Sequence, residues 1–201
     1  MKANVNKACI TPATAEHLPA IRELAALVWR AHYPGIISSE QIEYMLGRMY
    51  CLETMEDELR TGDVRFVRLL MDGGLIGFAS YGSTLEAGVA KLHKLYLHTR
   101  WQRRGFGSLL LEHCERAAHI QGAERMILAV NKRNTSAIAT YTRNGYDISE
   151  SVRTDIGGGF FMDDFIMMKN LRERVVALSD SLTDCSTIAP SSSASPEKLP
   201  P

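Results

Sequence analysis

The sequence has no excess of charge of either sign and no long apolar run. Lysine plus arginine and aspartate plus glutamate both number 23 in 201 residues, so no overall field attracts nucleic acid or an anionic membrane. No apolar stretch approaches the roughly 20 residues that a membrane helix needs, and no basic segment followed by an apolar one marks a secretory signal. We therefore expect a cytoplasmic protein that binds neither nucleic acid nor a membrane.

Cysteine is scarce and scattered. The four cysteines form no Cys-x-x-Cys pair and have no histidine cluster beside them; they are Cys9, Cys51, Cys114 and Cys185. This pattern argues against both a zinc site and a disulfide framework. We expect a protein of a reducing compartment that holds no metal.

Apolar residues are plentiful enough for one core of ordinary size. They make up 45% of the sequence, and charged residues make up 23%, as in typical globular domains. After about Ala177 the composition changes to serine, threonine and proline, which bury too little apolar surface to offset the entropy of ordering. The sequence predicts one domain over residues 1–177 and a disordered tail over residues 178–201.

The periodicity of apolar residues predicts the order of elements. The expected strands are residues 4–11, 64–71, 75–81, 89–97, 125–130, 146–153 and 160–169, and the expected helices are residues 14–30, 38–49, 52–60, 105–121 and 135–143. Asp72-Gly73 is suited to a tight hairpin turn. On helix 105–121 the apolar face is expected to contain Phe106, Leu109, Leu110, Cys114, Ala117 and Ile120. The order is typical of an α+β fold with one mixed, mostly antiparallel sheet flanked by helices.

One loop has the composition of a phosphate-binding site. Residues 102–107 read Gln-Arg-Arg-Gly-Phe-Gly and lie between an expected strand and an expected helix. The glycines let backbone N–H groups converge on an anion at the positive end of the helix dipole, and two arginines add charge. The Lys of a Walker loop and the third glycine of a dinucleotide fingerprint are both missing. An ATP- or NAD-dependent enzyme is therefore disfavoured.

The same loop resembles a signature of the GCN5-related N-acetyltransferases, the GNAT family. It has the form Gln/Arg-x-x-Gly-x-Gly/Ala, and the strand before it, Leu92–Leu97, looks like the central strand of that family. Downstream, Asn134-x-x-Ala137-x-x-x-Tyr141-x-x-x-Gly145-Tyr146 is similar to the second signature of the family. Asn134, Ala137 and Tyr141 also share one helical face by spacing alone.

The resemblance implies a fold, a cosubstrate and site residues. It implies a single GNAT-like domain that transfers an acetyl group from acetyl-CoA to a primary amine by direct attack, with Tyr141 protonating the departing sulfur. Asn134 would bond the pantetheine amides. The residues implied in cofactor binding are Leu95, Tyr96, Leu97, Gln102, Arg103, Arg104, Gly105, Phe106, Gly107, Ser108, Asn134, Ala137 and Tyr141.

The general base and the acceptor stay open. The central strand carries His93 where a glutamate is more common in the family, and Asp163 and Asp164 on the last strand are the other candidates. The acceptor pocket is expected over residues 29–49, where Tyr33, Tyr44, Glu40 and Glu43 lie; carboxylates there would favour a cationic amine. A small-molecule amine such as a polyamine is the first expectation. A peptide or protein N-terminus or lysine, an amino sugar, a non-catalytic CoA-binding regulator and a homodimeric state remain open.

Overall fold

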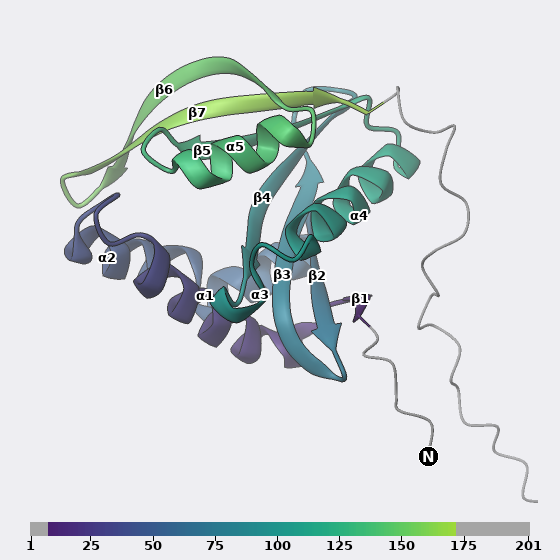
Figure 1. Ribbon diagram of the computed structural model, residues 1–201, viewed down its shortest axis with the longest axis horizontal. Coiled ribbons are helices and arrows are strands. Elements are labelled where there is room, and N and C mark those ends of the chain that lie inside the picture. Colours follow the sequence, from purple (N-terminus) through teal and green to yellow (C-terminus); the bar gives the residue numbers. More distant parts are fainter. Residues whose placement is uncertain (1–7, 172–201) are drawn as a thin grey trace, which may run out of the picture.

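The computed structural model describes residues 8–171 and shows one domain around a seven-stranded sheet (Figure 1). The strands are β1 (Ala8–Pro12), β2 (Val64–Met71), β3 (Gly74–Ser83), β4 (Val89–Leu97), β5 (Arg125–Asn131), β6 (Asp147–Gly157) and β7 (Phe160–Asn170). Their order in the sheet is β1-β2-β3-β4-β5-β7-β6. Only β4 and β5 pair in parallel, so the sheet is mixed and mostly antiparallel, as predicted.

Helices cover both faces of the sheet. The short 3-10 turns are η1 (Ala15–His17) and η2 (Thr99–Trp101), and the α-helices are α1 (Leu18–His32), α2 (Ser39–Met49), α3 (Leu52–Thr61), α4 (Phe106–Ile120) and α5 (Thr135–Arg143). One core lies between the sheet and α1 to α3, and a second lies between the sheet and α4 and α5. Figure 1 shows these two groups of helices on opposite sides of β4.

Local signals explain where several elements begin and turn. The Ser38 side chain accepts a hydrogen bond from the Gln41 N–H at 3.1 Å and so caps α2, as the predicted capping sequence requires. Asp72 and Gly73 both have positive φ, 50° and 81°, which is the conformation that closes a two-residue hairpin between β2 and β3. The predicted bounds of β4 and of the helix over residues 135–143 are confirmed.

Three expectations need correction or lie outside the described residues. Ile120 is 79% exposed, because α4 buries Leu110, Leu111, Cys114 and Ala118 and its last residue extends past the sheet. β6 runs to Gly157, beyond the predicted end at residue 153, because its partner β7 continues the ladder to the turn. Residues 4–7 of the first predicted strand and the predicted tail lie outside the described part of the chain.

The central strands separate halfway along their length. β4 and β5 pair only over Val89–Leu92 and Arg125–Leu128, although both strands continue beyond these residues. At the same place β4 contains a bulge, because Ser80 pairs with Lys94 and Tyr81 pairs with Leu92, which leaves His93 without an opposite residue. A bulge bends its strand and redirects side chains. The result is a wedge between β4 and β5 that opens toward Leu97.

Candidate active site

The predicted phosphate loop forms the turn into α4. Gln102 follows η2, and its side-chain amide donates to the Leu97 carbonyl at 3.2 Å, which ties the loop to the end of β4. Gly105 is the residue that caps α4 and has φ of 83°, a backbone conformation that glycine adopts without the usual steric cost. The N–H groups of the first turn of α4 have no partner within the helix and point toward any anion placed there.

Positive charge surrounds this turn. Arg103 has φ of 59°, so the backbone folds back tightly just before the glycine. Arg104 lies over the ring of Trp101, with its guanidinium carbon 5.2 Å from the ring centroid, an arrangement that favours the cation. The Ser108 hydroxyl accepts a hydrogen bond from the Asn144 side chain at 3.1 Å, which joins the first turn of α4 to the end of α5.

The second predicted motif lies on α5. Asn134 is buried and caps the helix, since its Oδ1 accepts from the Ala137 N–H at 3.3 Å and from the Ser136 hydroxyl at 3.2 Å. Its role toward pantetheine stays a prediction. Tyr141, one turn beyond Ala137, packs edge-on against Tyr146 with 5.8 Å between ring centroids.

The environment of Tyr141 keeps its phenol protonated. Burial, and then proximity to Tyr33 and Cys114, raise the pKa of Tyr141 above its ordinary value. A protonated phenol at neutral pH can donate a proton to a thiolate that is leaving. The geometry is therefore compatible with the predicted role of Tyr141 as the general acid.

Aromatic residues cluster on the face of β4 that α1 to α3 cover. Tyr33, at the end of α1, stacks on Trp29 with 4.4 Å between ring centroids, and its hydroxyl lies 3.5 Å from that of Tyr96 on β4. Tyr96 also packs near Tyr50 and Phe78. This cluster, Trp29, Tyr33, Tyr50, Phe78 and Tyr96, is called the aromatic floor below.

Asp164 faces the same side of the sheet as the aromatic floor. It pairs with Asn131 at the end of β5, beyond the point where β4 has separated. Because side chains alternate along a strand, Asp164 shares a face with Met162, which packs against the core of α1 to α3. Its side chain is buried, 7% of the residue is exposed, and Oδ1 has no hydrogen-bond partner. Asp164 therefore lies on the face of the sheet that α1 to α3 cover, beyond the point where β4 and β5 separate.

Asp164 has the electrostatics of a proton acceptor. Burial first, and then the neighbouring charge of Asp163, raise its pKa from 3.8 to about 6, against the opposing effects of Lys132 and Lys91. A carboxylate with this pKa is ionised at neutral pH and is a stronger base than an ordinary aspartate. Its Oδ1 has no hydrogen-bond partner among the described residues.

The other candidate groups lie elsewhere. Asp163 points to the opposite face of the sheet and forms an ion pair with Lys132, and Glu43 is held by Arg30 in a two-pronged pair at 2.8 Å. His93 lies at the bulge, where its ring is partly desolvated although the residue as a whole is accessible; this desolvation and the charges of Lys91 and Lys94 lower its pKa to about 4. A histidine with this pKa is neutral but weakly basic at pH 7.

Comparison with known proteins decides the family. The profile of the acetyltransferase (GNAT) family matches residues 21–146, which is more than half of the chain. The chain belongs to the GNAT family. Like other members, this GNAT enzyme uses acetyl-CoA as cosubstrate and is an N-acetyltransferase, as the sequence motifs predicted.

Named relatives add detail. The chain is 28% identical over 144 residues to a spermidine N(1)-acetyltransferase of Thermoplasma acidophilum, covering 70% of this chain and 88% of the relative. It is also 28% identical over 120 residues to a spermine/spermidine N(1)-acetyltransferase of Bacillus subtilis, covering 56% and 77%. The crystal structure of the PaiA N-acetyltransferase from Thermoplasma acidophilum in complex with coenzyme A superposes with a TM-score of 0.70 at 28% identity, covering 82% and 99%.

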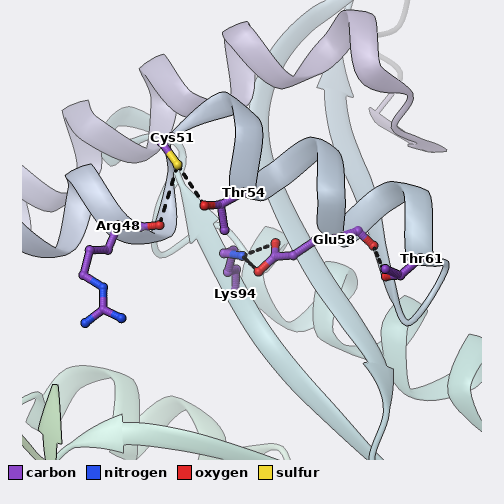
Figure 2. A network of polar contacts seen from close by, with 6 residues as sticks. All are labelled: Arg48, Cys51, Thr54, Glu58, Thr61 and Lys94. Atoms are coloured by element: carbon purple, nitrogen blue, oxygen red, sulfur yellow. Dashed lines mark hydrogen bonds and ion pairs between the residues drawn. The ribbon is translucent and has the colours of Figure 1, made fainter.

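A contact that sequence reasoning missed lies beneath the central strand of the GNAT enzyme. Lys94 is buried, with 2% of its side chain exposed, and its Nζ lies 2.6 Å from Glu58 Oε2 on α3 (Figure 2). The ammonium also lies 5.1 Å from the centroid of the Phe66 ring. Breaking such a buried pair costs several kcal/mol, on the order of 3 to 5. The pair therefore fixes the bulge of β4 to α3. The sequence did not predict this pair, because a lone lysine in strand 89–97 does not indicate its partner.

The long hairpin of β6 and β7 is fastened to α2 (Figure 1). Gln41 donates to the Phe161 carbonyl at 2.8 Å, and the Tyr44 hydroxyl donates to the Ile156 carbonyl at 2.7 Å. A Cβ on Gly158 would lie 2.8 Å from Tyr44, so glycine is required for this close approach. The hairpin tip is thus held against α2.

Residues 8–171 contain neither a cluster of metal ligands nor a membrane-spanning helix. Within residues 8–171, no group of three or more histidine, cysteine, aspartate or glutamate side chains is placed to hold a metal ion. In the same residues, no helix combines the length and the apolar character needed to cross a membrane. Cys9, Cys51 and Cys114 carry thiols, and Cys185 lies outside this range.

Proposed function

We propose that the enzyme acetylates a small cationic amine, with a polyamine such as spermidine as the preferred class. The observation that carries the proposal is Asp164, a buried carboxylate with an unpartnered oxygen beside the aromatic floor. An amine that enters as an ammonium needs a carboxylate that first binds the cation and then takes its proton. The names of the relatives from Thermoplasma acidophilum and Bacillus subtilis support the polyamine class.

The proposed reaction uses residues from both sides of the wedge between β4 and β5. The substrate ammonium gives a proton to Asp164, and the neutral nitrogen attacks the thioester carbonyl carbon of acetyl-CoA. The C–N bond forms, the C–S bond breaks, and Tyr141 gives its phenolic proton to the departing thiolate. Backbone N–H groups of residues 95–97, in the part of β4 that has separated from β5, are suited to stabilise the oxyanion. The phosphate groups of the cosubstrate lie at the first turn of α4 in this arrangement.

Direct transfer requires a protonated acid near the sulfur and an ionised base near the amine. Tyr141 remains protonated because burial raises its pKa, whereas Asp164 is ionised above about pH 6. The two groups therefore have opposite protonation states at neutral pH, as an acid and a base must. Balanced charge and scattered cysteines support a cytoplasmic location for this reaction.

An amine panel tests the proposal. Purified protein is incubated with acetyl-CoA and spermidine, spermine, putrescine, a peptide with an unblocked N-terminus, or glucosamine, and thiol release is followed. We expect kcat/KM for the best polyamine to exceed that for the peptide and the sugar by about 10-fold or more, since a carboxylate site discriminates by charge. Preference for the peptide would indicate an N-terminal acetyltransferase. Thermal stabilisation by acetyl-CoA without thiol release on any amine would indicate a CoA-binding regulator.

A further inference from the structure

The loop after α1 is held by an arginine from the other side of the wedge. Arg133, between β5 and α5, donates from Nη1 to the Ile36 carbonyl at 2.9 Å and from Nη2 to the Gly35 carbonyl at 2.6 Å. The two partners lie 97 and 98 residues away in the sequence. A planar guanidinium that bonds two successive carbonyls fixes both their positions and their direction.

A second contact runs parallel to the first. His32, the last residue of α1, lies with Nε2 3.1 Å from Oδ1 of Asn134, the residue that caps α5. Since Oδ1 is an acceptor, the ring nitrogen donates. Two adjacent residues of the β5–α5 connection therefore hold the chain on both sides of Tyr33.

Between Tyr33 and Ile37, which pack against the core of α1 to α3, the loop is exposed at Pro34 and Gly35. Ile36 and Ile37 donate local backbone hydrogen bonds, to the Tyr33 carbonyl at 2.9 and 3.2 Å. Arg133, by contrast, is anchored through its own N–H, which donates to Asn131 Oδ1 at 3.0 Å at the end of β5. The β5–α5 connection is thus fixed by its own hydrogen bond, and Arg133 ties the backbone of the loop to it.

We propose that Arg133 is a positioning residue for the acceptor, which holds Tyr33 in place over the acceptor side of the wedge and ties it to α5. Tyr33 directly follows α1 as its C-cap, and its hydroxyl lies 3.5 Å from the hydroxyl of Tyr96. The proposal rests on the proposed function in one respect: it takes the aromatic floor and Asp164 as the acceptor side. Arg133 itself touches neither the amine nor the thioester.

The kinetic test compares Arg133→Met with Arg143→Met. Arg143 is a matched control because it is an exposed arginine at the end of α5 that donates a hydrogen bond within that helix, to the Thr140 hydroxyl. We expect Arg133→Met to raise KM for the best amine of the panel by about 10-fold, with kcat changed by less than about threefold and acetyl-CoA stabilisation unchanged. Arg133→Lys, which keeps the charge but not the fork, should recover little of the loss.

A second test needs no amine substrate. Amide hydrogen exchange over residues 33–38 should quicken at least about fivefold in Arg133→Met relative to wild type and stay unchanged in Arg143→Met, because the loop loses its anchor. Unchanged exchange in Arg133→Met overturns the proposal. So does an equal weakening of acetyl-CoA binding, which would make Arg133 a cofactor ligand. If exchange quickens but no amine in the panel is acetylated, the positioning contact stands and the proposed function fails.

Discussion

The proposed cofactor side and the proposed acceptor side of this site are built by different means. The cofactor side is made largely of backbone from one continuous stretch, the end of β4, the loop into α4 and α5, and glycine gives it its shape. The acceptor side depends on side chains from elements far apart in the sequence, as where the Gln41 side chain on α2 bonds the Phe161 carbonyl on β7, 120 residues away. A backbone site is fixed by a short motif, whereas a side-chain site depends on the register of the whole sheet. The acceptor side can therefore change its specificity while the cofactor side stays the same.

We expect the largest loss of activity from Asp164→Asn, which tests the acceptor side of the comparison. The variant keeps the shape of the side chain but removes the base, and general acid–base assistance contributes about 100-fold to 10,000-fold. We expect kcat/KM for the best amine to fall by about 1000-fold, with the thermal shift produced by acetyl-CoA retained. Asp163→Asn, on the opposite face and paired with Lys132, is the control. Equal losses in the two variants would show that neither carboxylate is the base.

The same residue predicts a pH dependence. In the wild type, kcat/KM should rise as the pH increases through about 6, because Asp164 must lose its proton to act. In the fold the pKa is raised from 3.8 to about 6, so the folded state binds this proton more tightly than the unfolded state. Its contribution favours folding below about pH 4 and is lost as the pH rises to about 6. Asp164→Asn should abolish the rise in kcat/KM and remove the share of Asp164 from the stability trend, which rate measurements and urea unfolding at pH 4.5 and 7 would detect.

A smaller effect is expected on the cofactor side from Tyr141→Phe. The ring and its contact with Tyr146 remain, and only the hydroxyl is lost. Protonating a thiolate is an undemanding step, so we expect kcat to fall by about 100-fold, at the low end for a general acid. Binding of acetyl-CoA should be unchanged in a thermal shift assay. Tyr146→Phe serves as the control, and wild-type turnover of Tyr141→Phe where chemistry limits the rate would remove Tyr141 from the mechanism.

The phosphate loop itself is tested by Gly107→Val. A Cβ at this position would lie 3.5 Å from Leu97 Cδ1, an ordinary contact, so the larger side chain acts mainly on the space in front of the backbone N–H groups. We expect acetyl-CoA to bind about 10-fold more weakly, measured by titration. Gly47→Val in α2, where a Cβ meets nothing within 4 Å, controls for the cost of valine in a helix. Equal acetyl-CoA affinity in both variants would mean that the phosphates bind elsewhere.

The smallest effect concerns the hairpin tip. Gly158 and Gly159 both have positive φ, 64° and 78°, but only at Gly158 does an added Cβ meet Tyr44, at 2.8 Å. Gly158→Ala should therefore raise KM for the amine about threefold more than Gly159→Ala, since it alone pushes the hairpin away from α2. Acetyl-CoA affinity should be equal in the two variants. The same amine KM in both would show that the hairpin tip does not shape the acceptor side.

The sequence predicted the elements around the proposed cofactor side well for a physical reason. The strand over residues 89–97 and the helix over residues 135–143 have clear periodicity, and the loop between β4 and α4 is defined by local backbone needs. Ile120 was placed on the wrong surface because apolar spacing does not tell where a helix outruns its sheet. Helical spacing alone cannot supply that information.

The acceptor side was predictable only in outline. Asp163 and Asp164 were equal candidates, and the alternation of β7 against β5 assigns them to opposite faces. The alternating partners Phe165 and Met167, which belong to the core beside α4, were a signal in the sequence that could have separated them. Lys94 could not have been found in this way, because the bulge at His93 breaks the alternation just before it. Contacts such as that of Arg133 with Gly35 depend on a separation of 98 residues, which no local pattern records.

The burial of Lys94 also protects the enzyme from its own chemistry. A protein that holds an activated thioester exposes every nearby amine to acetylation, and Lys94 lies on the strand that borders the proposed thioester site. Its Nζ forms an ion pair with Glu58 (Figure 2), and it also lies over the rings of Phe66 and Tyr50. An ammonium in an ion pair has no lone pair with which to attack a carbonyl. Burial and the ion pair with Glu58 thus keep the Lys94 amine from acting as a nucleophile.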